Sequence, residues 1–320
     1  MSAEVENMFS LKQVPWHGQG VILENAPTPE EAIKAAGLDW EVKLVPLGGE
    51  LDGEPLKDVR RWATVRATDR RVLGTVGPTY HVLQNKDAFK FFQPVLDAGE
   101  AYLETAGSLR KGQRIWILAR VKQDPVEIVP GDAVLSYILL SNGHDGFMSI
   151  RAGFSSIRVV CANTLAAAHE GAASKLLRVR HTENAAKTLE EIREIMDLGR
   201  REFVASTEKM RALARKGVNA TDLQEYVRKV FQPKVTLTTE AEQKKSCERL
   251  MGKIIPLFEK GRGNDMPGVK GTMWAAYNAV NEYIGWERGR ADIRLDSLWF
   301  GDGANVNKRA FDLALKVAAA

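Results

Sequence analysis

The stretch AYLETAGSLRKGQRIWILARV, residues 101–121, contains two strand-like runs on either side of the turn Arg110-Lys111-Gly112. A second pair of strand-like runs follows, DAVLSYILLSN and FMSIRAGF, with the turn GHDG (143–146) between them. Connections this short join antiparallel strands, because parallel neighbours need a crossover of a dozen or more residues. The segment therefore predicts two consecutive β-hairpins.

Helices are predicted on both sides of these hairpins. On the N-terminal side, residues 85–99 place apolar side chains on one face of a helix, and the helix over 28–37 begins with a capping box of Thr28 and Glu31. On the C-terminal side, SIRVVCANTLAAAHEG (156–171) is typical of a strand that runs into a helix of small residues. Further strands are predicted at 40–47, 59–67 and 71–76.

The second half of the chain has a helical pattern. We expect one long amphipathic helix over 184–216, followed by helices that begin at the caps Thr221 and Thr239. The predicted fold class is α+β: antiparallel β-hairpins flanked by helices, followed by an all-helical C-terminal part. The predicted division is an α+β core domain with an antiparallel sheet (1–180) and a helical domain (181–320).

Composition narrows the class of protein. With 44% hydrophobic and 27% charged residues, the 320-residue chain resembles an ordinary folded globular protein. No run approaches the roughly 18 apolar residues of a membrane span, and residues 1–20 are too polar for a signal peptide. The two cysteines, Cys161 and Cys247, lie far apart and outside any CxxC pair. We therefore expect a reduced cytoplasmic protein with no membrane partner.

Motifs for metals and cofactors are missing from the sequence. The five histidines show neither HxxxH nor HExxH spacing, so no metal site is predicted. The loop GRGNDMPGVKG (261–271) has the glycine gap of a phosphate loop, but Val269 stands where that motif requires lysine. We expect a flexible glycine loop here and no nucleotide or other cofactor.

Catalysis stays open as an alternative. The chain has no GxSxG motif, and an enzyme would have to use Cys161 or a group of Asn163, His169 and Glu170. Cys161 lies where a predicted strand meets a helix, and a helix N-terminus can lower the pKa of a thiol. The competing interpretation is a small buried residue, since free cysteines are usually buried and inert. No catalytic residue is predicted, and a protein that is not an enzyme is favoured.

Basic residues gather in the strand regions. Between Lys57 and Arg71, six basic residues oppose two acidic ones, a local excess equal to the net charge of +4 for the whole chain. Single-stranded nucleic acid is typically held by a basic groove with aromatic stacking surfaces. The alternative is that these charges only solvate exposed strand faces. The residues predicted to contact nucleic acid are Arg60, Arg61, Arg66, Arg70, Arg71, Arg110, Lys111, Arg114, Trp116, Arg151 and Arg158.

Several stretches carry a family resemblance. They are PWHGQG (15–20), PTYHVLQN (78–85), RIWILARV (114–121), IRVVCANTL (157–165), TMWAAYNAVNEYIGW (272–286) and LWFGDGANVNKRAFDLAL (298–315). On these residues the chain resembles the phage/plasmid-like proteins that contain domain of unknown function 932. The resemblance spans nearly the whole chain and implies a mobile-element context, but it brings little agreed biochemistry.

A second resemblance is one of topology. The order of helix, antiparallel hairpins and helix is similar to the core of the single-strand annealing superfamily that includes the Rad fifty-two, RecT and Erf types. In that superfamily a basic groove holds stretched single-stranded DNA along an oligomeric ring or helix. The likeness places Arg110, Lys111, Arg114, Arg151 and Arg158 at the groove, although a shared fold does not establish function by itself.

Three hypotheses follow from the sequence. The first is a homo-oligomeric protein that binds and anneals single-stranded DNA, without a metal or nucleotide. The second is a protein-interaction or oligomerisation module that uses the helix 184–216 and the aromatic stripe Trp274–Tyr277. The third is an enzyme that uses Cys161. The amides of Asn163, Asn278 and Asn281 either bind a ligand or satisfy the protein's own backbone, and the backbone role is favoured.

Overall fold

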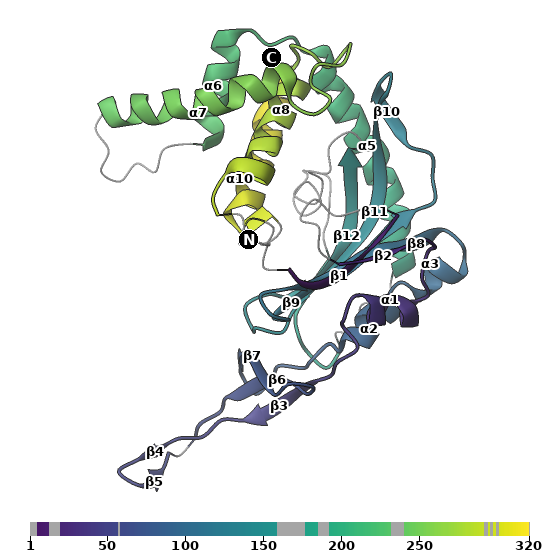
Figure 1. Ribbon diagram of the computed structural model, residues 1–320, viewed down its shortest axis with the longest axis vertical. Coiled ribbons are helices and arrows are strands. Elements are labelled where there is room, and N and C mark those ends of the chain that lie inside the picture. The colour runs from purple at the N-terminus through teal and green to yellow at the C-terminus, as the bar shows by residue number, and fades with distance from the viewer. Residues whose placement is uncertain are drawn as a thin grey trace.

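An eight-stranded sheet forms the centre of the computed structural model (Figure 1), which describes residues 5–12, 20–56, 58–158, 177–184, 192–231, 240–290, 294, 297–298 and 301–319. Its strand order is β13-β12-β11-β9-β8-β1-β2, and β10 pairs with β11 outside this path. The two predicted hairpins, β8–β9 and β11–β12, are confirmed as antiparallel pairs. The strands are β1 (Val5–Leu11), β2 (Val21–Leu23), β8 (Ala101–Leu109), β9 (Arg114–Val121), β10 (Val126–Val129), β11 (Asp132–Gly143), β12 (Ile150–Arg158) and β13 (Leu177–Val179).

Apolar side chains cover both faces of this sheet. Along β9, Ile115 and Ile117 belong to one hydrophobic cluster, and Trp116 and Leu118 belong to another, because successive strand residues point to opposite faces. The first cluster also contains residues of the N-terminal helices, which therefore pack on that face. These helices are α1 (Pro29–Ala35), α2 (Asn85–Lys90) and α3 (Gln93–Asp97).

Two of the helix predictions have different outcomes. The capping box of α1 is confirmed, since Thr28 Oγ1 accepts from the Glu31 N–H and the Glu31 carboxylate accepts from the Thr28 N–H. The single helix predicted over 85–99 is wrong, because it is divided into α2 and α3. Pro94 has no N–H to donate to the carbonyl of Lys90, where α2 ends.

A second, smaller sheet projects from one end of the molecule (Figure 1) and is called the arm here, residues 42–76. Its three antiparallel strands lie in the order β3-β6-β7, and a two-stranded hairpin forms its tip. The strands predicted at 40–47, 59–67 and 71–76 are confirmed. The arm strands are β3 (Val42–Pro46), β6 (Trp62–Arg66) and β7 (Arg71–Val76), and the tip strands are β4 (Glu50–Leu51) and β5 (Glu54–Pro55).

Hydrogen bonds fix the arm at two levels. At its base, the Val42 N–H donates to Gln84 Oε1 at 3.0 Å, and Gln84 Nε2 donates to the Val42 carbonyl at 2.8 Å. Further out, the Leu47 N–H donates to the Arg61 carbonyl at 2.9 Å. The tip, residues 48–60, therefore lies beyond the hydrogen bond between Leu47 and Arg61.

Helices are the main secondary structure of the described residues from Ile192 onward. They are α5 (Ile192–Arg215), α6 (Ala220–Phe231), α7 (Glu240–Lys260), α8 (Met273–Glu282) with its π-helical turn η1 (Tyr283–Glu287), and α10 (Asp302–Ala319). The helix predicted over 184–216 is described from Ile192 and contributes buried Phe203, Met210 and Leu213. The cap predicted at Thr221 is wrong, because Asn219 Oδ1 accepts from the Asp222 N–H and the Asp222 carboxylate accepts from the Asn219 N–H.

The helical part packs directly against the sheet. One hydrophobic cluster joins Ile128 and Val134 of the sheet to residues of α5, α6, α8 and α10. Helix α5 contacts both β10 and β12. The chain is thus α+β with antiparallel sheets and a helical C-terminal part, and the division into domains at residue 180 stays a prediction. In the described segments, no helix combines the length and apolar character needed to cross a membrane.

Candidate functional site

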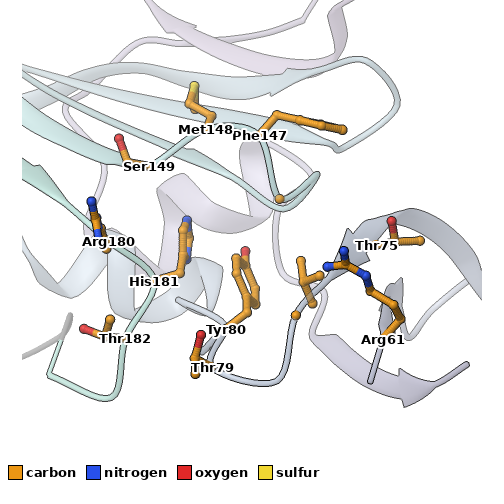
Figure 2. Close-up of a pocket in the computed structure, with 13 residues that line it drawn as sticks. Arg61, Thr75, Thr79, Tyr80, Phe147, Met148, Ser149, Arg180, His181 and Thr182 are labelled. Atoms are coloured by element: carbon orange, nitrogen blue, oxygen red, sulfur yellow. The ribbon is translucent and has the colours of Figure 1, made fainter. Parts of the chain in front are cut away.

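A groove of about 660 Å³ lies where the arm meets the large sheet (Figure 2). Three segments far apart in the sequence form it: the end of β7 with the loop after it, the turn between β11 and β12, and the residues after β13. Arg61 joins them from the start of β6. The lining residues are Arg61, Thr75, Val76, Gly77, Thr79, Tyr80, Gly146, Phe147, Met148, Ser149, Arg180, His181 and Thr182.

A close approach of two backbones holds this junction together. Gly74 of β7 lies against the turn of the large sheet, and a Cβ atom at Gly74 would lie 2.5 Å from the carbonyl oxygen of Asp145. Beside this contact, Thr64 Oγ1 donates to the His144 carbonyl at 2.7 Å. The Tyr80 hydroxyl donates to the Gly143 carbonyl at 3.0 Å. The arm is therefore fixed to the turn that forms the upper wall of the groove.

Two aromatic rings form the floor of the groove. Tyr80 and His181 stack with their centroids 4.5 Å apart and an interplanar angle of 23°. The segments that carry them are bonded together, since the His81 N–H donates to the His181 carbonyl at 3.0 Å and His181 Nδ1 lies 3.2 Å from the His81 carbonyl. Burial raises the pKa of the Tyr80 hydroxyl and lowers the pKa of His181. Both rings are therefore neutral near pH 7.

The charge of the groove is positive. Its lining contains Arg61 and Arg180 and no carboxylate, and Figure 2 shows the two guanidinium groups near opposite ends. Both arginines are exposed, and neither pairs with a carboxylate in the segments that the structure describes. The nearby carboxylate of Asp145 is buried and accepts from Arg114 Nε at 3.2 Å and from the Phe147 N–H at 2.9 Å. The two free cations are thus available to an anionic ligand.

An aromatic ring stands open to solvent at the groove. Phe147 has 89% of its surface exposed, although phenylalanine usually lies in the core. It projects from the turn after Asp145, and its neighbour Met148 is buried. Hydroxyl side chains complete the lining at Thr75, Thr79, Ser149 and Thr182. The groove therefore offers cations, hydroxyl groups and an open aromatic face together.

Of the residues predicted to contact nucleic acid, Arg61 lies in the groove. Arg66 has a structural role, because its buried guanidinium donates to both Glu6 carboxylate oxygens at 2.9 Å and to Asp69 at 2.7 and 3.0 Å. These bonds raise the pKa of Arg66, and the bond from Arg66 lowers the pKa of Asp69 to about 2. The contact predicted at Arg66 is therefore replaced by a link between the arm and β1.

Two more of the predicted contacts are buried. Trp116 is 2% exposed and covers the Gly107 position on the neighbouring strand, where a Cβ would lie 2.5 Å from the ring. Arg158 is 5% exposed and forms an ion pair with Asp132 inside the protein. Neither side chain presents a surface to a nucleic acid here, so both are left out of the proposed interface.

The remaining predicted residues do not line the groove. Arg60, Arg70 and Lys111 are exposed, and Arg71 is half-buried with its Nε 3.4 Å from Asp69. Arg110, Arg114 and Arg151 are partly buried and have contacts of their own. Arg60 is next in sequence to the groove residue Arg61. None of the other six predicted residues is part of the groove lining.

Several groove residues were missed from the sequence. Tyr80, Phe147, Arg180 and His181 were not predicted, although Tyr80 lies in the stretch PTYHVLQN that carries the family resemblance. A surface-exposed phenylalanine cannot be told from a buried one in a short apolar run such as FMSI. The groove is formed by segments that are far apart in the sequence, so its residues could not be predicted from local patterns.

The other candidate sites provide no comparable surface among the described residues. Cys161, Asn163, His169 and Glu170 lie outside the described residues. The predicted stripe Trp274–Tyr277 is buried within the helical part, so it offers no free surface. Asn278 is also buried, and its Nδ2 donates to the Trp274 carbonyl at 2.8 Å. Among the described residues, no group of three His, Cys, Asp or Glu side chains is arranged to hold a metal ion.

Fold and groove together define an α+β protein with a basic, aromatic surface groove at the base of a β-arm. The chain belongs to the family described as Domain of unknown function (DUF932), whose model matches residues 72–299. The match begins in β7, so it includes every groove residue except Arg61 and excludes β3–β6 of the arm. No curated protein and no solved structure matches the chain significantly.

Proposed function

We propose that this protein binds single-stranded DNA in the groove and anneals complementary strands, as a homo-oligomer of phage or plasmid type in the cytoplasm. The observation that carries the proposal is the lining of the groove. Exposed Arg61 and Arg180 lie near its two ends, and the open ring of Phe147 stands on its wall. No metal or nucleotide is needed for this function.

The two arginines favour a polyanion over a small neutral ligand. Arginine donates several N–H groups in a fixed plane and matches the geometry of phosphate oxygens. Two such groups at separate points along one groove suit separate phosphates of one strand. Release of counterions from these phosphates makes binding weaker as the salt concentration rises.

The aromatic ring favours a single strand over a duplex. Bases stack on exposed aromatic side chains of single-strand-binding proteins, and each stacked base contributes roughly 1–3 kcal/mol. In a duplex the faces of the bases are already covered by their neighbours. Phe147 therefore adds a preference for unpaired bases that the arginines alone lack.

The annealing step and the mobile-element context rest on resemblance. The chain has helices before and after antiparallel hairpins, as the single-strand annealing superfamily has. Such a likeness in element order supports the proposal by analogy. The groove itself supports only strand binding, so binding and annealing are tested separately.

The test uses a fluorescently labelled strand of about 50 nucleotides, long enough for several sites of order 10 nucleotides. We expect saturable binding at low salt, weaker binding at higher salt, and a weaker affinity for the matching duplex. Faster pairing of two complementary strands in the presence of the protein would support annealing. Absence of strand binding at low salt would overturn the proposal, and binding without faster pairing would remove annealing alone.

A specific observation also supports the second hypothesis, an interaction module. The arm exposes several large apolar side chains, although the predicted aromatic stripe is buried. The enzyme hypothesis stays a prediction for Cys161. Unchanged stability and unchanged cellular effect after Cys161→Ser would count against a reactive thiol.

A further inference from the structure

The arm exposes an unusual share of the large apolar side chains of this protein. Seven of the twelve large hydrophobic side chains exposed among the described residues lie between Leu44 and Val72. Leu51 at the tip is 65% exposed, and Leu56 is also exposed. Clusters of exposed apolar residues usually mark an interaction surface. The arm therefore has the composition of a surface that another molecule covers.

Acidic residues outnumber basic ones around these leucines, because residues 48–60 contain four carboxylates against Lys57 and Arg60. Glu50, Asp52 and Glu54 are exposed within the same hairpin. None of these carboxylates forms an ion pair in the part of the chain described by the structure. The tip thus combines two open leucines with three unpaired negative charges, and its partner should be apolar and basic.

Helix α7 offers a surface of that kind. Lys245, Arg249, Gly252 and Pro256 are all exposed and follow one another at spacings of three and four residues, which places them on one face. We call this the α7 face. Apart from the backbone of the helix itself and the two chain neighbours, no atom lies within 4 Å of a Cβ built at Gly252, so the helix surface is open there. The α7 face has two cations beside Gly252 and Pro256, and two exposed glutamates, Glu248 and Glu259, border it. Further exposed lysines at Lys244, Lys253 and Lys260 keep the exposed side of the helix basic as a whole.

The two surfaces lie at opposite ends of one molecule. Figure 1 shows the tip, β4 and β5, at one end of the long axis and α7 near the other. They cannot meet within one chain in this conformation. A contact between them therefore requires a second copy, and such a head-to-tail contact produces a ring or an open chain of copies.

We propose that the arm tip of one copy docks on the α7 face of the next. Leu51 and Leu56 lie over Gly252 and Pro256, and the carboxylates of the tip face Lys245 and Arg249. This contact would be the interface of the homo-oligomer in the proposed function. The contact itself is argued independently, and only its role in strand annealing rests on the proposed function. It leaves the groove at the arm base open.

The test measures mass in solution by sedimentation over a range of protein concentrations at low salt. We expect wild type to assemble beyond the monomer. Lys245→Glu combined with Arg249→Glu should weaken assembly at least tenfold by repelling the acidic tip. Adding Glu50→Lys and Asp52→Lys to that variant should restore it, because the charges are then exchanged across the contact. Val204→Ser, which changes an exposed apolar residue of α5, is the matched control and should have no effect.

Each outcome decides the inference. A monomeric wild type, an unaffected double variant or a failed rescue would overturn it, provided that circular dichroism shows folded protein. Strand binding is measured on the same samples. A monomer that binds DNA would overturn the arm contact and the homo-oligomer of the proposed function but would leave strand binding in place. An assembled protein that binds no DNA would overturn strand binding and leave the arm contact in place.

Discussion

Arg158 and Asp132 meet in a two-pronged ion pair, with the Nε–Oδ1 and Nη2–Oδ2 distances both 2.7 Å. Trp274 of α8 donates to the same carboxylate at 2.8 Å, and the guanidinium also donates to the Gly263 carbonyl at 3.0 Å. Asp132 and Arg158 belong to the sheet, whereas Trp274 and Gly263 belong to the helical part. The buried pair therefore ties the two parts together.

Removal of Arg158 should destabilise the protein strongly. Arg158→Ala leaves the Asp132 carboxylate buried without its partner, which typically costs about 3–5 kcal/mol. Urea unfolding measures the loss. Arg70→Ala, at an exposed position, should change the free energy of unfolding by less than about 0.5 kcal/mol. Equal small effects for the two variants would contradict the structural role of Arg158.

The arginines of the groove should act on binding and not on stability. Arg61→Ala and Arg180→Ala should each weaken the affinity for single-stranded DNA. Each should also reduce the slope of log K against log salt by about 0.7, the value for one phosphate contact with a single strand. Fluorescence anisotropy at several salt concentrations measures both. Lys308→Ala on α10 serves as the control, and a similar change in that variant would argue against a contact specific to the groove.

Phe147 should contribute through stacking. Phe147→Ala should weaken strand binding by about 1–3 kcal/mol, or roughly 5- to 150-fold. Phe147→Trp keeps an aromatic face and should retain most of the affinity. Because the side chain is exposed, the melting temperature should hardly change in either variant. Full affinity in the alanine variant would remove Phe147 from the interface.

Gly74 should tolerate no side chain. Gly74→Ala places a methyl group 2.5 Å from the Asp145 carbonyl oxygen, and the resulting strain should cost about 1–3 kcal/mol. Thermal unfolding measures it, and strand binding should weaken as well because the groove wall moves. Gly48→Ala is the matched control, since no atom lies within 4 Å of its added Cβ. Similar melting temperatures for both variants would contradict the close approach.

Buried His144 should make stability depend on pH. Its Nε2 lies 3.0 Å from Asn85 Oδ1, and burial lowers its pKa to about 3. In the unfolded chain the imidazole takes up its proton below pH about 6.5. Its contribution is complete above that pH and falls by up to about 1.4 kcal/mol per pH unit down to about pH 3. His181 acts with the same sign.

The check is the free energy of unfolding at pH 7, 6 and 5 for wild type and His144→Gln. Although the variant is expected to be less stable throughout, its stability should fall less steeply than that of wild type as the pH decreases. Parallel curves would show that His144 is not buried in its neutral form.

Local patterns were sufficient to predict the two hairpins and insufficient to predict some helix ends. The hairpins could be predicted because each is formed by neighbouring strands with a short turn. The pairing of β9 with β11 joins the two hairpins and depends on a contact that no local pattern carries. The interruption at Pro94 was visible in the sequence, but the apolar face on both sides of it suggested one helix.

The candidate site was predicted less well, for a physical reason. Whether an arginine is exposed depends on carboxylates elsewhere in the chain. Glu6 lies 60 residues before Arg66, and Asp132 lies 26 residues before Arg158. Likewise, the groove exists because Gly74 allows β7 to approach the turn at Asp145. Such pairings of distant segments decide which basic residues remain free.

The hydrogen bond between Leu47 and Arg61 allows the arm to vary in length. Everything beyond it, residues 48–60, is a closed loop, and doubling the length of such a loop costs only about 0.6 kcal/mol in closure entropy. Arg61 is at once the last anchor of the loop and the first residue of the groove. The tip can therefore grow or shrink while the groove keeps its shape. In the proposed head-to-tail assembly, the length of the arm would set the spacing between the proposed DNA-binding grooves of neighbouring copies.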